Sequence, residues 1–202
     1  MDSILTNVAD YYSQKVKDHG ATPSGVDWNS SESQENRFTQ LLNVCNKQHF
    51  SVFDYGCGYG ALLSFLRKNK ISSEYFGFDV SKEMIATAQV KFESDKNCFS
   101  TIPPTKIFNY TVASGIFNVR LNTSDAEWLD YILKTIEEMD RTCDLGFSFN
   151  ALTKYSDKEF MKDYLYYADP LFLFDHCKKN FSKNVALLHD YNLYEFTILI
   201  RK

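Results

Sequence analysis

The segment FDYGCGYGA, residues 53–61, constrains the fold of this chain more than any other stretch. It closes a short apolar run, sets three glycines at alternate positions, and leads into ALLSFLRKN, which reads as a helix. A strand that passes through glycines into a helix exposes backbone N–H groups at the positive end of that helix. The turn therefore predicts a ligand site at the carboxyl end of a buried strand.

Strands and helices alternate along the rest of the chain. Strands are predicted at 50–56, 74–80, 97–100, 107–119, 143–152, 184–191 and 193–202. Alternation of this kind implies right-handed crossovers and a parallel sheet with helices on both faces. The last two strands are joined so closely that they must run antiparallel. The predicted fold is α/β: a doubly wound, seven-stranded, mostly parallel sheet with a C-terminal antiparallel hairpin.

Residues 1–48 are predicted to form an N-terminal arm and one helix, outside the sheet. The arm is polar, and glycines and a proline interrupt any helix after Tyr12. The helix is expected to begin near Ser31, because the spacing of Ser31 to Gln34 fits a capping box.

Residues 49–202 are predicted to form the main domain. Within it, residues 156–167 have no place in the alternation and read as an inserted amphipathic helix. Ser156 and Glu159 have the spacing of its capping box.

Composition excludes several classes of protein. The net charge is −4 and the pI about 5.6, so no nucleic-acid partner is expected. The five cysteines have no metal-ligand spacing, so no metal site is expected, and reduced thiols in a cytoplasmic protein are the expectation. No apolar run approaches the ~18 residues of a membrane span, and the first residues lack the pattern of a signal peptide.

The spacing of the glycines indicates which ligand the turn receives. It is G-x-G-x-G rather than the G-x-G-x-x-G of dinucleotide sites, and Asp54 would repel a pyrophosphate but attract an ammonium group. Asp79 follows Gly60 by 19 residues, close to the ~20-residue offset at which an acidic residue binds a ribose hydroxyl. The predicted ligand carries a ribose and an amine, without a phosphate.

FDYGCGYG followed by YFGFDVSKEMI resembles the class I S-adenosylmethionine-dependent methyltransferases, and the resemblance covers roughly residues 50–202. It implies their Rossmann-like fold and S-adenosylmethionine as the cofactor. The residues that it assigns to cofactor binding are Asp54, Gly56, Cys57, Gly58, Gly60, Asp79, Val80, Met84, Ala113, Ser114 and Gly115. In that assignment Asp54 and the turn hold the methionine end, Asp79 binds the ribose, and Val80 and Met84 pack near the adenine.

The N-terminal arm is expected to lie over this cofactor as a lid. Trp28, Gln34 and Arg37 are its predicted contacts, with Arg37 pairing to the methionine carboxylate. A local ion pair of Arg37 remains an equal alternative. Tyr12 is expected to close over the sulfonium on the acceptor side through a cation–π contact, or else to pack against other rings.

The glycine-containing loop ASGIFNV, residues 113–119, in which the fourth predicted strand ends, occupies the place of the family's active-site motif. Phe117 and Asn118 are expected to face the acceptor, with loop capping as the alternative role of Asn118. The loop lacks the Asn-Pro-Pro-aromatic motif of many adenine and glutamine N-methyltransferases. His189 is the candidate base, although a structural or surface histidine is an open alternative. Tyr155 and Tyr191 are the further candidates for the acceptor pocket.

The expected function is transfer of the methyl group of S-adenosylmethionine to a small-molecule acceptor by in-line displacement. A sugar or glycan precursor is one candidate acceptor. The alternatives are a regulatory protein that binds S-adenosylmethionine without catalysis, a protein methyltransferase, and a dinucleotide-dependent oxidoreductase. The sequence does not indicate the oligomeric state.

Overall fold

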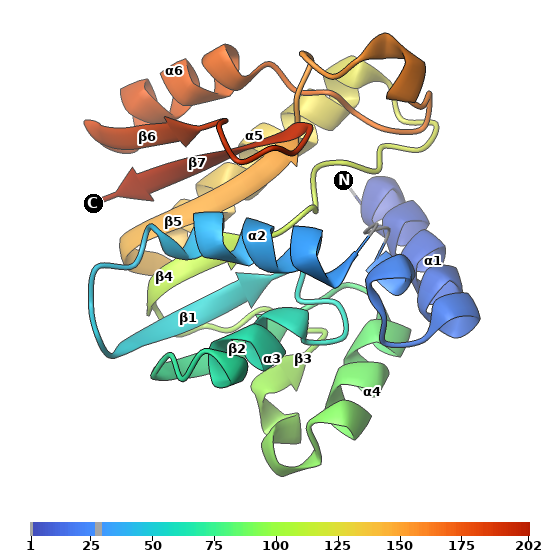
Figure 1. Cartoon of the computed structure of the whole chain (residues 1–202), viewed down its shortest axis with the longest axis vertical. Coiled ribbons are helices and arrows are strands. Elements are labelled where there is room, and N and C mark those ends of the chain that lie inside the picture. Colours follow the sequence, from blue (N-terminus) through green and yellow to red (C-terminus); the bar gives the residue numbers. More distant parts are fainter. Residues whose placement is uncertain (1, 27–29) are drawn as a thin grey trace.

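The computed structural model of the chain describes residues 2–26 and 30–202. Its centre is a seven-stranded sheet of order β3-β2-β1-β4-β5-β7-β6 (Figure 1). The strands are β1 Phe50–Tyr55, β2 Ser73–Phe78, β3 Phe99–Ser100, β4 Phe108–Ala113, β5 Cys143–Leu152, β6 Asn184–Leu188 and β7 Glu195–Arg201. The first five pair in parallel, whereas β7 is antiparallel to β5 and β6. The predicted sheet with its antiparallel C-terminal hairpin is confirmed.

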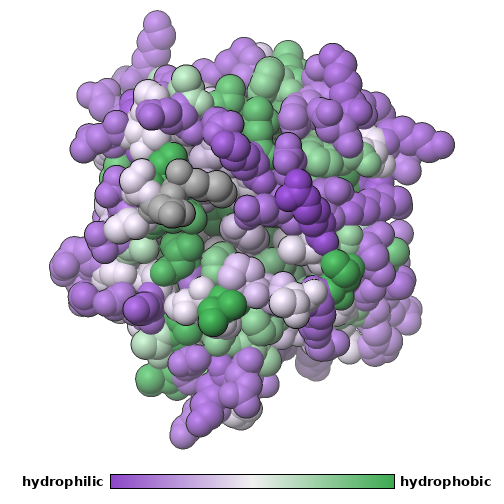
Figure 2. All heavy atoms as spheres, turned by 180° about the vertical axis from the view of Figure 1, so that it is seen from behind, coloured by the Kyte–Doolittle hydropathy of each residue, from purple (hydrophilic) through white to green (hydrophobic). Residues whose placement is uncertain are grey.

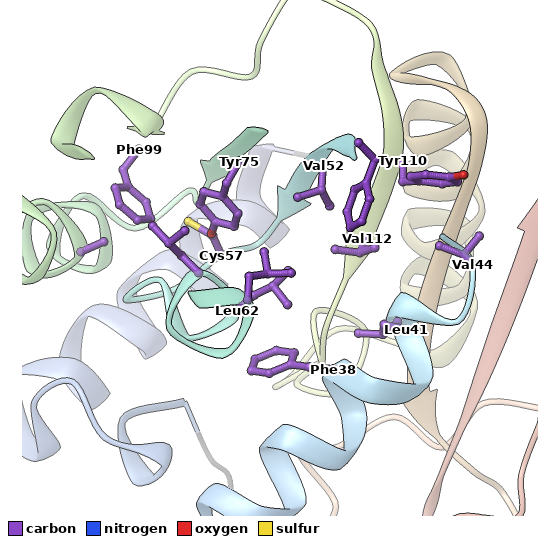
Figure 3. Packing of buried hydrophobic residues seen from close by; sticks show 14 of the residues in the cluster. Phe38, Leu41, Val44, Val52, Cys57, Leu62, Tyr75, Phe99, Tyr110 and Val112 are labelled. Atoms are coloured by element: carbon purple, nitrogen blue, oxygen red, sulfur yellow. The ribbon is translucent and has the colours of Figure 1, made fainter. Parts of the chain in front are cut away.

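Helices cover both faces of this sheet, and in Figure 1 α2 lies in front of it and α5 behind. The helices are α1 Asp2–His19, α2 Ser31–Leu42, α3 Ala61–Lys68, α4 Lys82–Lys91, α5 Asp125–Arg141 and α6 Pro170–Asn180, with short 3-10 turns η1 Pro23–Val26, η2 Glu93–Cys98 and η3 Lys158–Phe160. Figure 3 shows Phe38 and Leu41 of α2 and Leu62 of α3 gathered with Val52 and Val112 of the sheet. Burial of each such side chain stabilises the fold by about 1.5–3 kcal/mol.

The opposite face of the sheet is covered by α5 and α6. Trp128 of α5 is fully buried in a second cluster that also holds Leu173 of α6 and Phe147 and Phe149 of β5. The indole N–H of Trp128 donates to the backbone oxygen of Phe117 at 2.9 Å. This bond ties α5 to the loop that follows β4.

Hydrophilic residues make up most of the face seen in Figure 2, and hydrophobic residues appear there in small separate groups. None of the described helices combines the length and the apolar character needed to cross a bilayer.

The N-terminal arm differs from the prediction. Asp2–His19 form one continuous helix, α1, instead of a polar arm that loses helical character after Tyr12. Leu5, Val8, Tyr12 and Val16 recur at helical spacing, and Val16 is buried with Tyr12 packed beside it. Most residues of this segment are polar, so the apolar stripe was not recognised from the sequence.

Polar contacts join α1 to the start of α4. The Ser13 hydroxyl donates to Glu83 Oε2 at 2.7 Å and shares a 2.8 Å hydrogen bond with the hydroxyl of Ser81, the N-cap of α4. Lys17 pairs with Glu83 at 3.3 Å. The helix is thereby held over the carboxyl end of the sheet.

The helix α2 begins at Ser31, as predicted, but its N-cap is a different residue. Its N-cap is Ser30, whose hydroxyl accepts from the Ser33 N–H at 3.1 Å, so the predicted box from Ser31 to Gln34 is not the cap. The helix packs on β5 and β7 and contributes to the main core. The predicted boundary after residue 48 thus separates α2 from the sheet that it covers.

The predicted inserted helix at 156–167 is wrong. Only the short turn Lys158–Phe160 is helical there. The backbone oxygen of Tyr164 instead accepts from Arg120 N at 3.1 Å and Leu121 N at 3.0 Å, and Tyr166 N donates to Asn118 O at 2.8 Å. Pairing with the loop after β4 satisfies backbone groups that a local helix would have satisfied internally.

Candidate active site

The glycine turn joins β1 to α3 and is held in a conformation that favours glycine. Gly56, Gly58 and Gly60 have φ of 81°, 52° and 79°. A Cβ on Gly56 would lie 2.3 Å from a methyl group of Ile116, and one on Gly58 would lie 3.3 Å from Val26. Because Ile116 and Val26 lie so close to the turn, a side chain would clash at the first position and be crowded at the second, and glycine is needed.

Asp79 lies beyond the end of β2 and braces this turn. Its Oδ2 accepts from Gly58 N at 2.9 Å, and its Oδ1 accepts from Ser81 N at 2.8 Å. Burial raises the pKa of Asp79, and the hydrogen bonds from Ser81 and Gly58 oppose that rise. The carboxylate therefore fixes the main chain on both sides of the site.

Asp54 is 3% exposed near the end of β1, and its Oδ2 accepts from the Tyr75 hydroxyl at 2.7 Å. Burial raises the pKa of Asp54 to about 7, against the lowering effect of the Tyr75 hydrogen bond and with a further rise from Asp79. A cation beside Asp54 would favour its ionised form. The site thus suits a positively charged ligand group.

A cavity, here called the turn cavity, opens above the turn at the carboxyl ends of β1, β2 and β4. Gly56, Gly58 and Asp79 line it together with Val80 and Met84. These five residues are among those that the resemblance assigns to the cofactor, and the structure brings them together.

The other walls of the turn cavity come from the loop after β4 and from α1. Ser114 and Gly115 belong to the predicted set, and Tyr12 was expected on the acceptor side. The cavity is also lined by residues that the sequence did not indicate, namely Leu5, Val8, Val26, Tyr55, Phe78, Ile116 and Tyr131. Tyr55 and Phe78 flank the two acidic residues in sequence, whereas no pattern near Tyr131 pointed to the site.

A smaller inner cavity lies behind the turn. Asp54, Cys57 and Gln34 line it, as does Ser114, which the two cavities share. Gln34 Oε1 accepts from the Tyr59 hydroxyl at 3.2 Å. Asp54 and Gln34 are far apart in the sequence, but both line this inner cavity.

The donor and acceptor groups of these two cavities fit S-adenosylmethionine. The Ser114 hydroxyl oxygen is buried and finds no hydrogen-bond partner among the described residues. It lies in the same inner cavity as the Asp54 carboxylate, so an amino-acid headgroup would find partners there. Asp79 in the turn cavity has the chemistry to accept from ribose hydroxyls.

A second hollow, here called the tyrosine cleft, has a volume of about 590 Å³. It adjoins the turn cavity, because Tyr12 and Val26 line both. Among its other lining residues are Tyr164, Tyr167, Tyr194, Lys15, Lys162, Arg37, Asn118 and Glu195.

Arg37 lines the tyrosine cleft and neither of the two cavities at the turn. Its Nε donates to Glu195 Oε2 at 2.8 Å, and both side chains are buried. The structure thus pairs Arg37 with a residue 158 positions away, which is not the local pair at the helix start that was its alternative. Its contact with the methionine carboxylate stays a prediction.

The loop after β4 places its predicted acceptor contacts differently. Phe117 is fully buried with its ring against Phe149 and Tyr131, so it belongs to the core and faces no cleft. Asn118 lines the tyrosine cleft, but its side-chain oxygen accepts from Leu152 N at 3.0 Å. This hydrogen bond gives Asn118 a structural role in holding the loop, which was its alternative role.

His189 and its companions lie apart from the turn cavity and the tyrosine cleft. His189 is exposed past the end of β6, near the rings of Tyr155 and Phe196, and Tyr155 is 57% exposed. Tyr191 is buried, with its hydroxyl bonded to that of Thr197 at 3.0 Å. The structure does not bring these predicted acceptor and base residues together at the site, and Trp28 lies outside the described residues.

Gly60 and Ala113 support the site from outside its cavities. Gly60 is the N-cap of α3, where a Cβ would lie within 3.0 Å of Phe92 and Phe99. Ala113 ends β4 and is fully buried in the core. Their predicted contact with the cofactor remains a prediction.

Comparison with known proteins agrees with this geometry. Residues 52–144 match the family described as "Methyltransferase domain". The chain is 52% identical over 157 residues to the Mycobacterium tuberculosis protein named "Putative methyltransferase Rv1506c", an alignment that covers 76% of this chain and 93% of that protein.

Solved structures share the fold at low sequence identity. Magnesium protoporphyrin IX methyltransferase (ChlM) from Synechocystis PCC 6803 with bound SAH has a TM-score of 0.63 at 15% identity, over 100% of this chain and 96% of that one. The DhpI-SAM-HEP complex has a TM-score of 0.64 at 12% identity, over 98% of both chains. Half of the aligned residues are identical in a relative of which the alignment covers 93%, so the chain belongs to the class I S-adenosylmethionine-dependent methyltransferases.

Proposed function

We propose that the chain transfers the methyl group of S-adenosylmethionine to a small-molecule acceptor held in the tyrosine cleft. The observation that carries the proposal is the shared wall of Tyr12 and Val26 between this cleft and the turn cavity. In-line displacement requires the nucleophile and the methyl donor to be held in adjoining spaces. A volume of about 590 Å³ is in the range of small-molecule sites.

S-adenosylmethionine, when bound, supplies a methyl group that is already activated for displacement. The chain would contribute mainly position: Asp54 and Ser114 would hold the amino-acid end and Asp79 the ribose. Leu5 and Val8 of α1, which line the turn cavity, would exclude water from it. The protein's part in the reaction is therefore orientation and desolvation rather than covalent chemistry.

The lining of the tyrosine cleft supports a polar acceptor. Tyrosine hydroxyls, an asparagine and charged side chains surround the space, and such groups match the hydroxyls of a sugar or glycan precursor. ChlM, which shares the fold, is named for action on magnesium protoporphyrin IX, so a small-molecule acceptor is compatible with this fold.

Incubation with methyl-labelled S-adenosylmethionine and a metabolite extract depleted of macromolecules tests the proposal. S-adenosylhomocysteine and a labelled small molecule are expected. Tight cofactor binding with no S-adenosylhomocysteine formed would instead indicate the regulatory alternative. Label that appears only after addition of a protein fraction, and stays with it, would indicate a protein methyltransferase.

A further inference from the structure

Glu195, the first residue of β7, lines the tyrosine cleft and is 1% exposed. In the register of the sheet it lies opposite Leu152 of β5, so Asn150 is its diagonal neighbour on the same face. Its Oε2 accepts two hydrogen bonds, from Arg37 Nε at 2.8 Å and from Asn150 Nδ2 at 2.8 Å. One oxygen of this carboxylate is thus held by donors from two different elements.

The other oxygen of Glu195, Oε1, is buried and has no hydrogen-bond partner among the described residues. An ionised carboxylate only accepts hydrogen bonds, and a buried acceptor without a donor is costly. Native structures keep few such atoms, and each one calls for an explanation. Because Glu195 lines the tyrosine cleft, a molecule bound in that cleft can supply the missing donor.

Hydrogen bonds also fix Glu195 relative to the cofactor site. Asn150, which donates to Glu195, accepts from Gly115 N at 2.7 Å through its own Oδ1. Gly115 lines the turn cavity, and the tyrosine cleft adjoins this cavity at Tyr12 and Val26. A group that donates to Oε1 would therefore be held in the space next to the methyl donor.

We propose that Glu195 Oε1 accepts the hydrogen bond of the O–H or N–H group that attacks the methyl carbon, and takes its proton during the transfer. The inference rests on the proposed function and adds the residue that acts on the acceptor, together with the class of the attacking group. A carboxylate oxygen or a carbon atom brings no such donor. The acceptor is therefore an alcohol, a phenol or an amine.

The transfer balances with Glu195 as the proton acceptor. A lone pair of the attacking oxygen or nitrogen forms the new bond to the methyl carbon, while the carbon–sulfur bond breaks and its electron pair stays on sulfur. The positive charge that would otherwise remain on the methylated acceptor leaves as a proton to Oε1. Water that enters the cleft after the product has left removes this proton. A positioned base of this kind contributes about 10²–10⁴-fold to the rate.

The test measures single-turnover formation of S-adenosylhomocysteine by the full-length chain, in excess over S-adenosylmethionine, with the metabolite extract depleted of macromolecules as the source of acceptor. Glu195→Gln keeps the size of the side chain but cannot take a proton. Its rate is expected to be at least about a hundredfold lower, with a Kd for S-adenosylhomocysteine within about twofold of the wild-type value. Glu137→Gln is the matched control, because Glu137 also pairs with an arginine, Arg141 at 3.3 Å, but lies exposed on α5. It should react at the wild-type rate.

Chemical rescue separates proton transfer from a structural role of Glu195. Glu195→Ala leaves room beside Arg37 for a small planar anion. Formate and nitrate can both pair with the guanidinium group there, but nitrate is too weak a base to take the proton. Formate is expected to raise the rate of Glu195→Ala about tenfold, whereas nitrate should not raise it. Equal rescue by the two anions would show that Glu195 acts only as the partner of Arg37, and would overturn the inference.

The product of the wild-type chain tests the class of the attacking group, whether or not the variants fold. With an isotopic label in the methyl carbon, the NMR spectrum should show a methyl group on oxygen or nitrogen that resists mild alkali. A methyl ester, which alkali hydrolyses to methanol, or a methyl group on carbon would overturn the inference. Wild-type turnover by Glu195→Gln would overturn it as well. If the wild-type chain forms no S-adenosylhomocysteine from the extract, the proposed function itself fails.

Discussion

Asp54 couples cofactor binding to protonation. Its pKa of about 7 means that the folded protein holds a proton which the unfolded chain, with an ordinary value of 3.8, has released. Between about pH 4 and pH 7 the folded state binds more protons, so the contribution of Asp54 to stability decreases as the pH rises through this window. A bound ammonium group favours the ionised carboxylate, so binding lowers its pKa and releases the proton.

The affinity for S-adenosylhomocysteine is therefore expected to rise from pH 5 to about pH 7, by up to about tenfold per pH unit, and then to level off. Calorimetry across this range measures it. Asp54→Asn should bind more weakly and without this slope. The matched ligand is 5′-methylthioadenosine, which lacks the amino-acid end and should show no slope with the wild-type chain. Parallel slopes for the two ligands would contradict the role of Asp54.

Asp79 has two roles: it holds the glycine turn through hydrogen bonds to the backbone, and it is proposed to bind the ribose. Asp79→Ala removes the acceptor of the Gly58 and Ser81 N–H groups along with the proposed ribose contact. Two lost charge-assisted hydrogen bonds predict an affinity for S-adenosylhomocysteine at least about a hundredfold lower. Glu74→Ala, near the exposed start of the same strand, is the control and should bind as the wild type does. A Kd for Asp79→Ala within a few fold of that of the control would show that Asp79 does not contribute to binding of the ligand.

Single residues also show where sequence reasoning reaches its limit. Asp54 and Asp79 could be identified because each sits at a strand end with glycines at a known offset. Glu195 could not, because it follows Tyr194 in an unremarkable strand start, and its pairing with Arg37 spans 158 residues. Contacts made only by the tertiary fold leave no local pattern in the sequence.

At the scale of elements, α1 acts as one wall of the turn cavity. Its apolar stripe supplies Leu5 and Val8 to that wall, while Val16 packs with Tyr59 and Met84 at the other end. Leu5 and Val8 also pack against the core cluster of α5, so this end of the helix contacts both the core and the ligand space.

Replacing Leu5 and Val8 together by alanine is expected to weaken binding of S-adenosylhomocysteine about tenfold, since apolar surface against the ligand is lost. Calorimetry measures the affinity, and thermal unfolding should remain cooperative. Gln14→Ala, an exposed position of the same helix, is the control for changes in helix stability. Equal affinities for the double variant and the control would show that α1 does not cover the ligand.

Elements were predictable where local chemistry decides their ends. The capping box of Ser124 with Glu127 and the N-cap of Asp169 before Pro170 are examples, because the spacing of their residues is itself the signal for a helix start. The segment 156–167 was not predictable in this way. Its Tyr164 and Tyr166 make backbone bonds to the loop after β4, and such partners are invisible in the local pattern.

The whole molecule is built on a sheet whose mostly parallel strands and antiparallel end could be inferred from alternation and hairpin length, whereas its strand order came from the structure. Those rules act on every strand, so errors at single helix ends did not alter the fold. The placement of α1 and α2 over the sheet required the structure, because no crossover rule governs helices that precede the first strand. The folded chain is expected to respond to its cofactor as one cooperative unit.

S-adenosylhomocysteine at a hundred times its Kd should stabilise the chain by about 2.7 kcal/mol. For a domain of this size the midpoint of thermal unfolding should then rise by about 5–10 °C. NADH at the same concentration should leave the midpoint unchanged, because the turn lacks the spacing of a dinucleotide site. A shift with NADH and none with S-adenosylhomocysteine would favour the dinucleotide oxidoreductase.

The central claim is that the turn after β1 holds an amino-acid headgroup linked to a nucleoside. A crystal structure of the chain with S-adenosylhomocysteine tests it most directly. We expect the amino group within hydrogen-bonding distance of Asp54, the ribose hydroxyls on Asp79, and the sulfur facing the tyrosine cleft between Tyr12 and Val26. A ligand bound elsewhere, or one whose sulfur points away from that cleft, would contradict it.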